Sequence, residues 1–172
     1  MDKLNVLISK EEIESKVADL ADDLRRDYKD KRPILIGILK GSFVFMSDLI
    51  RKMDIPVEID FVRLSSYGSG KETSGKIRHV HGVNIPIRDR HVLVIEDIVD
   101  RGLTVHFLLD YLGRQEPASL KLCTLFDKPS GRAMEITIDY VGFTLPDSFV
   151  VGYGLDFDEK FRYLPDLYVL ED

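Results

Sequence analysis

The sequence has little of what would place a protein outside the cytoplasm or in a membrane. Its single cysteine, Cys123, cannot form a disulfide within the chain and lies in the apolar run LKLCTLF, where a free cysteine usually packs as a small hydrophobe. The longest uncharged apolar runs, such as residues 33–39, are far shorter than the ~20 residues that span a bilayer. The N-terminal segment lacks the long apolar stretch of a secretory signal. We therefore expect a cytoplasmic protein with no membrane partner.

Basic residues are also too few for a nucleic-acid-binding protein. Lys and Arg number 24 against 30 Asp and Glu, which gives a formal net charge of -6. Because neutralisation of phosphates supplies most of the affinity for a polyanion, we expect no nucleic acid among the partners. The 172 residues, 44% apolar and 31% charged, have the length and composition of one globular domain. A single domain over 1–172 is predicted.

Apolar periodicity predicts strands that alternate with helices. Ser9 and Glu12 have capping-box spacing at the start of a predicted helix over 10–29. A strand, a tight loop and a helix follow in PILIGIL and FVFMSDLI, and again in HVLVIEDIV and TVHFLLDYL. Further strands are predicted at residues 56–64, in LKLCTLF, in YVGF and in FVVGYGL, and the segment LPDLYVL closes the chain. This order favours a doubly wound α/β fold, a mainly parallel sheet with helices on both faces.

A long polar stretch interrupts the pattern between residues 65 and 90. Loops longer than ~12 to 15 residues in a compact domain are usually functional lids or disordered segments. Weak alternation in KIRHVHGVNIPI indicates a hairpin in part of this stretch. We expect a flexible lid at about 65–90.

The strongest candidate site is VLVIEDIVDRGLT, residues 92–104, because ligands of such sheets bind at the carboxyl ends of the strands. A buried strand delivers Glu96, Asp97 and Asp100 into a turn with Gly102 and Thr104. The amides of residues 101–104 at a helix N-terminus suit a phosphate dianion. Carboxylates would repel that phosphate unless they face sugar hydroxyls or Mg²⁺. The alternative is a solvated strand end with acidic residues near a helix start.

This order of residues resembles the signature of phosphoribosyltransferases that use phosphoribosyl pyrophosphate (PRPP), and nearly the whole chain resembles the bacterial hypoxanthine-guanine phosphoribosyltransferase family. ILKGS at 38–42 is similar to the family's pyrophosphate loop, and SSYGSG near 65–70 to its mobile lid. LFDKPS at 125–130 is similar to its purine-anchoring strand end, and PDSFVVGYGLDFDEKFR at 146–162 to its base-stacking hood and metal segment. The resemblance implies the type I phosphoribosyltransferase fold, with a small hood from about 146–172.

The resemblance also implies a role for each matching residue. Asp100 is the implied catalytic residue, a general base that interacts with purine N7. The implied ribose-phosphate ligands of PRPP are Glu96, Asp97, Arg101, Gly102, Leu103 and Thr104. The implied pyrophosphate ligands are Lys40, Gly41 and Arg162, with a cis peptide before Lys40. The implied lid residues are Ser66 and Tyr67. The residues implied to bind the purine are Lys128, Phe149 and Val150. The implied metal ligands are Asp156, Glu96 and Asp97.

Each of these residues also has an ordinary structural interpretation. Lys40 can belong to a plain strand-to-helix turn. Lys128 can be a surface lysine before a proline. In the functional interpretation its ammonium is desolvated and donates to O6 of an oxopurine, whereas the 6-amino group of adenine offers no acceptor. The run FVV at 149–151 is more often a core strand than a base platform. Asp156 and Arg162, taken alone, are ordinary surface charges.

One residue departs from the family's pattern. Arg101 stands where the phosphate loop usually has a small hydroxyl residue. A side-chain hydroxyl contact to phosphate is therefore absent, while the backbone amide remains and a guanidinium can contact phosphate directly.

The activity implied is Mg²⁺-dependent transfer of 5-phosphoribosyl from PRPP to N9 of hypoxanthine or guanine, which yields IMP or GMP and pyrophosphate. A homo-oligomer, dimer or tetramer, is implied as well. Two other functions fit parts of the sequence. A regulator on the same fold would bind RNA or DNA, which the net charge of -6 disfavours. A phospho-acceptor receiver domain would carry its acidic pair after the first strand, whereas this pair lies at residues 96 and 97.

Overall fold

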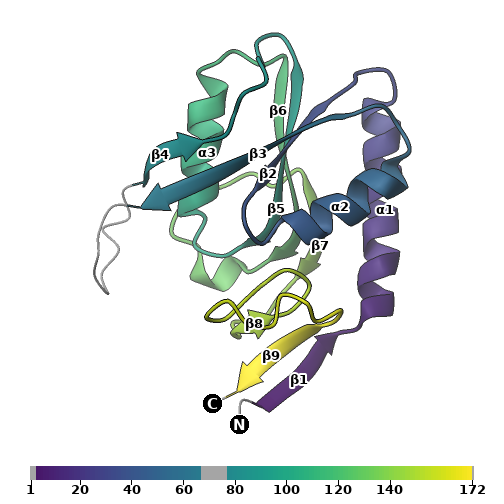
Figure 1. Ribbon diagram of the computed structural model, residues 1–172, viewed down its shortest axis with the longest axis vertical. Coiled ribbons are helices and arrows are strands. Elements are labelled where there is room, and N and C mark those ends of the chain that lie inside the picture. Colours follow the sequence, from purple (N-terminus) through teal and green to yellow (C-terminus); the bar gives the residue numbers. More distant parts are fainter. Residues whose placement is uncertain (1–2, 67–76, 172) are drawn as a thin grey trace.

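The computed structural model describes residues 3–66 and 77–171, and a central sheet occupies most of the molecule (Figure 1). The elements are β1 (Lys3–Ile8), α1 (Lys10–Tyr28), β2 (Ile34–Ile38), α2 (Phe43–Met53), β3 (Glu58–Ser66), β4 (Ile77–His81), β5 (His91–Val99), α3 (Leu103–Gly113), β6 (Ser119–Asp127), η1 (Pro129–Gly131), β7 (Tyr140–Thr144), β8 (Val150–Val151) and β9 (Leu167–Glu171). The central sheet has six strands in the order β4-β3-β2-β5-β6-β7. The five strands from β3 to β7 in this order run parallel, and β4 pairs antiparallel with β3 at one edge.

Helices cover both faces of this sheet, with α1 and α2 on one side and α3 on the other (Figure 1). All five residues of β2 are buried, and they alternate between the two faces. Leu35 packs in the cluster that contains α1 and α2, while Ile34 and Ile36 pack in the cluster that contains α3. The predicted doubly wound α/β fold is confirmed.

The first long helix begins at the predicted capping box. The hydroxyl of Ser9 accepts the Glu12 amide at 3.2 Å, and Oε2 of Glu12 accepts the Ser9 amide at 2.8 Å. Buried apolar residues then recur along one face of α1 from Ile13 to Tyr28. The predicted helix over 10–29 is confirmed within one residue of its end.

A small antiparallel sheet, in the order β1-β9-β8, lies beside the central one and joins the two ends of the chain. The sequence pattern does not predict β1, half of whose six residues are exposed and whose partner β9 lies at the far end of the chain. The predicted strand FVVGYGL is wrong beyond its start, because β8 contains Val150 and Val151 only. The chain turns away at Gly152, where φ is 102°.

The polar stretch from 65 to 90 contains β4, which pairs antiparallel with β3. The segment KIRHVHGVNIPI supplies only this one strand of the pair, because no strand follows His81 in the described residues before β5. Ser66 ends β3, and the predicted lid residue Tyr67 lies outside the described residues. Within 3–66 and 77–171, no helix has both the length and the apolar character needed to cross a membrane.

Candidate active site

Two predicted loops meet at the carboxyl ends of two neighbouring strands in the central sheet. β2 and β5 are parallel neighbours, so the loop after β2 and the loop after β5 emerge side by side. Gly41, in the first loop, packs so closely on Asp97, at the end of β5, that a Cβ at position 41 would overlap Oδ2 of that carboxylate. The peptide between Leu39 and Lys40 is cis, as the resemblance implies. The structure thus places the predicted pyrophosphate loop against the predicted acidic pair.

The acidic pair is buried, with Glu96 and Asp97 each 7% exposed, so it is not a solvated strand end. The Asp97 amide donates to Oε1 of Glu96 at 3.0 Å, and the Ile98 amide donates to Oδ1 of Asp97 at 2.8 Å. Burial, and then the charge of Asp97, raise the pKa of Glu96 well above its usual value. Groups that donate to these oxygens, such as sugar hydroxyls or a cation, would offset this uncompensated negative charge.

The phosphate loop leads from this pair into α3. Gly102 has φ 82° and immediately precedes the helix, so the amides of the first turn point out of the fold. A cavity of about 300 Å³ opens here, lined by Glu96 and residues 98–105. A Cβ on Gly102 would come 3.1 Å from Cδ of Arg132, which lies behind the loop. The predicted ligands at 101–104 therefore share one cavity with Asp100.

Asp100 faces the end of β6. Nζ of Lys128 lies 3.7 Å from Oδ2 of Asp100 and 3.3 Å from Oδ1 of Asp147. The Lys128 side chain is 13% exposed, so it is not a surface lysine. Its ammonium lies at the mouth of the site, between two carboxylates from distant segments. Asp147 is a residue that the sequence analysis missed, and nothing in its local sequence marks it.

Arg132, also missed, connects β6 with the phosphate loop. Its guanidinium pairs with Asp127 at the end of β6. Its Nε donates to the carbonyl oxygen of Asp100 at 3.0 Å, and the Ala133 amide donates to the carbonyl oxygen of Arg101 at 2.9 Å. The segment after η1 thus supports the backbone of the loop that carries the predicted catalytic residue.

A cluster of charges surrounds Lys40 in the predicted pyrophosphate loop. Nζ of Lys40 lies 2.7 Å from Oε1 of Glu159, and this ion pair lowers the pKa of Glu159. Arg162 pairs with Oδ1 of Asp156 at 2.8 Å and donates from Nη1 to the carbonyl oxygen of Gly154 at 2.7 Å. Lys40, Arg162 and Asp156 are therefore brought together, with Glu159 between the two cations. Glu159 was missed, although it lies within the segment that carries the resemblance.

The two predicted base-stacking residues differ in exposure. Phe149 is 52% exposed, and its ring meets that of Phe157 edge to face at 5.5 Å between centroids. Val150 is buried in β8 and pairs with Val169 of β9. Phe149 is free to present a ring face to a ligand, while Val150 offers its backbone.

A metal centre made by protein ligands alone is not part of this arrangement. Among the described residues, no three His, Cys, Asp or Glu side chains lie close enough together to hold a metal ion. Asp156 pairs with Arg162, apart from the Glu96 and Asp97 pair. Mg²⁺ commonly uses one or two carboxylates and completes its shell with waters and substrate phosphates. The carboxylates present fit a cation that binds together with a pyrophosphate group.

A cavity at the start of α3, a buried acidic pair and a loop with Lys40 lie together at the carboxyl ends of β2 and β5. The family model for the phosphoribosyl transferase domain matches residues 7–158. The chain therefore belongs to the phosphoribosyltransferase family.

Within that family, the relatives are purine enzymes. The chain is 47% identical over 167 residues to the hypoxanthine-guanine phosphoribosyltransferase of Streptococcus pneumoniae R6, a match that covers 97% of this chain and 93% of that protein. A crystal structure of a Bacillus anthracis hypoxanthine-guanine phosphoribosyltransferase is similar with a TM-score of 0.89 at 41% identity and covers 100% of both chains. The chain is thus a member of the hypoxanthine-guanine phosphoribosyltransferase branch.

Some relatives are longer. The bifunctional protein TilS/HprT of Listeria monocytogenes (strain F2365) is 45% identical over 166 residues. That match covers 96% of this chain and 26% of the relative. The chain therefore spans about a quarter of the length of such bifunctional relatives.

Proposed function

We propose that this chain transfers 5-phosphoribosyl from PRPP to N9 of hypoxanthine or guanine and so salvages purine bases. The observation that carries this proposal is the contact of the buried acidic pair with the loop of Lys40 and Gly41, beside the phosphate cavity. The phosphate of such a substrate matches the cavity, its ribose hydroxyls match the acidic pair, and its pyrophosphate matches the loop of Lys40 and Gly41. The names of the relatives, hypoxanthine-guanine phosphoribosyltransferases, support the purine acceptor.

The phosphoribosyl group would bind at β5. The amides of Arg101, Gly102, Leu103 and Thr104 would donate to the 5′-phosphate at the start of α3. Glu96 and Asp97 would accept hydrogen bonds from the ribose hydroxyls, which would offset the burial and the repulsion by Asp97 that raise the pKa of Glu96. C1′ would then face Asp100.

The purine would bind between Asp100 and the hood. The ammonium of Lys128 would donate to O6, which hypoxanthine and guanine have and adenine lacks. Asp100 would accept the proton from N7 as the base attacks C1′. Phe149 would stack on the ring, and the backbone of Val150 would contact its edge. Specificity for oxopurines would then come from the ammonium of Lys128, whose side chain is 13% exposed.

The pyrophosphate leaves as C1′ becomes cationic, so negative charge builds on the leaving group. Lys40, the Gly41 amide and Arg162 would bind that charge. Mg²⁺ bound to PRPP would supply further neutralisation of the leaving group. Asp156, with Glu96 and Asp97, would hold such an ion through waters or directly.

A homo-oligomer, dimer or tetramer, is part of this proposal. Two exposed aromatic residues support it, Phe43 at 46% and Tyr163 at 83% exposure, because they line a cavity of about 490 Å³ that a second copy can cover. Sedimentation of the wild-type protein and of Tyr163→Asp tests this part. We expect the variant to sediment as a lighter species. If both proteins have the mass of one chain, the proposal of an oligomer is contradicted.

A steady-state assay with PRPP, Mg²⁺ and each purine base in turn tests the enzymatic part. IMP and GMP are expected from hypoxanthine and guanine, with adenine as the control base. No nucleotide from any base contradicts the proposal. In that case a salt-titrated RNA-binding assay distinguishes the regulator, whose affinity would fall steeply with salt.

A further inference from the structure

Tyr153 occupies a backbone position that a bulky side chain rarely adopts. It lies between Gly152 and Gly154, and its own φ is 48°. This left-handed region favours glycine, so a tyrosine stays there only where its surroundings hold it. The residue is 8% exposed and packs in the core cluster that contains α1 and α2. Its side chain is therefore held at a defined place against these helices.

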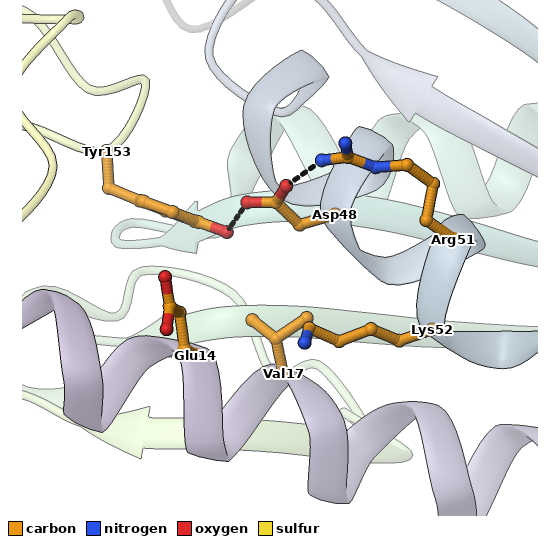
Figure 2. Close-up of a pocket in the computed structure, with 6 residues that line it drawn as sticks. All are labelled: Glu14, Val17, Asp48, Arg51, Lys52 and Tyr153. Carbon is orange, nitrogen blue, oxygen red and sulfur yellow. Dashed lines mark hydrogen bonds and ion pairs between the residues drawn. The ribbon is translucent and has the colours of Figure 1, made fainter.

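The hydroxyl at the end of that side chain reaches α2. It donates a hydrogen bond to Oδ2 of Asp48, and Figure 2 shows the phenol pointing across to this carboxylate. The other oxygen of Asp48 pairs with Arg51 on the same helix. Glu14 of α1 lines the same cavity of about 360 Å³. Burial, with the hydrogen bond to Asp48, raises the pKa of Tyr153, so the phenol keeps the proton that it donates.

Asp48 belongs to the helix that follows the pyrophosphate loop. α2 begins at Phe43, directly after that loop. Gly154, next to Tyr153, lies against the same loop, since a Cβ there would come 2.5 Å from the carbonyl oxygen of Gly41. The hydrogen bond from Tyr153 thus joins the segment around Gly154 to α2, the helix that follows Gly41.

The segment fixed in this way carries the cation expected to bind pyrophosphate. The carbonyl oxygen of Gly154 accepts Nη1 of Arg162 at 2.7 Å, and the Gly154 amide donates to the carbonyl oxygen of Arg162 at 3.1 Å. A shift of Gly154 away from Gly41 would therefore move Arg162 relative to Lys40.

We propose that Tyr153, through its hydrogen bond to Asp48, is a positioning residue that sets the distance between Arg162 and the loop of Lys40 and Gly41. It acts on the pyrophosphate end of PRPP and not on the purine. This inference rests on the proposed function, because it assumes that PRPP binds at this edge of the sheet.

The test is Tyr153→Phe, which removes one oxygen atom and keeps the ring. The KM for PRPP and the inhibition constant of pyrophosphate are expected to rise together, about five- to tenfold for one lost hydrogen bond. The KM for hypoxanthine is expected to change less than about twofold. Asp48→Asn keeps an acceptor oxygen and should stay closer to wild type than Asp48→Ala.

Tyr140→Phe is the matched control. Tyr140 also donates its hydroxyl to a helix carboxylate, Oδ2 of Asp27, at 2.7 Å, and it is 9% exposed. It lies on β7 and faces α1, so its loss should lower the melting temperature without a change in the KM for PRPP. If both variants lose stability and neither changes PRPP or pyrophosphate binding, Tyr153 has a structural role only and the inference is overturned.

Calorimetric binding of PRPP with Mg²⁺ separates this inference from the proposed function, because it needs no turnover. Weaker PRPP binding by Tyr153→Phe supports the inference even where wild type forms no nucleotide, a result that would contradict the activity alone. Normal turnover by wild type with unchanged PRPP binding in the variant contradicts the inference alone. A wild type that binds no PRPP overturns both.

Discussion

The carboxylate of Asp97 packs directly on Gly41, and this contact joins the end of β5 to the loop after β2, which no local sequence pattern connects. β2 and β5 are parallel neighbours in the sheet. The contact holds the buried acidic pair beside the backbone of the pyrophosphate loop. It leaves no room for a side chain at position 41.

Gly41→Ala should therefore damage the site with little effect on the rest of the fold. The added methyl group would displace either the carboxylate of Asp97 or the loop itself. We expect kcat/KM for PRPP to fall about 100-fold, which corresponds to about 2.7 kcal/mol of transition-state stabilisation. Steady-state kinetics measures the loss. Gly113→Ala is the control, because a Cβ there would meet Cδ2 of Leu120 at an ordinary 3.9 Å. Equal kinetics for the two variants would show that the Asp97 contact does not matter for PRPP.

Asp100→Asn should lower turnover while nucleotide affinity is largely retained. The amide keeps the size and one acceptor of the carboxylate but accepts a proton far less readily. We expect a fall of about 100-fold in kcat, at the low end for the loss of a general base. Unchanged kcat would remove Asp100 from the chemical step. Asp110→Asn serves as control, because Asp110 lies on α3 in an exposed pair with Arg114.

Arg132→Met should destabilise the protein, because it leaves Asp127 without its partner. The side chains of Arg132 and Asp127 are 18% and 16% exposed, so water cannot fully solvate the Asp127 carboxylate once the guanidinium is lost. We expect the free energy of unfolding to fall by about 2 kcal/mol, less than for a fully buried pair. Urea denaturation measures it. Arg114→Met, which breaks an exposed pair, should cost less than about 1 kcal/mol. Equal losses in the two variants would argue against a structural role for the Arg132 network.

The parts of the site that lie in one contiguous segment could be predicted from sequence. Glu96, Asp97, Asp100 and Gly102 follow one buried strand within a few residues, and strand, loop and helix each have their own periodicity. The structure brings Glu96, Asp100 and Gly102 to one cavity, while Asp97 packs on Gly41.

The residues that were missed each have a partner far away in the chain. Arg132 is an isolated arginine in sequence, and its role depends on contacts with Asp127 and with the backbone of Asp100. The burial of Lys128 likewise depends on packing that no local pattern encodes. β1 was missed because its stability comes from β9, at the opposite end of the chain. Tertiary contacts of this kind leave no periodic signal.

The hydrogen bond from Tyr140 to Asp27 should make stability depend on pH. This bond lowers the pKa of Asp27 from its usual 3.8, with Arg26 adding a smaller effect against the opposing effect of burial. For a carboxyl whose folded pKa is lowered, the gain is complete above the unfolded pKa of about 3.9 and is lost as the pH falls through the folded value. Tyr140→Phe should therefore cost about 1 kcal/mol at pH 7, the value of one hydrogen bond. The gap to wild type should narrow to about half as the pH falls from about 5 through the lowered folded pKa of Asp27, since a neutral acceptor makes a weaker bond. Urea denaturation of both proteins across this range measures the gap, and a gap independent of pH would show that the charge on Asp27 contributes nothing.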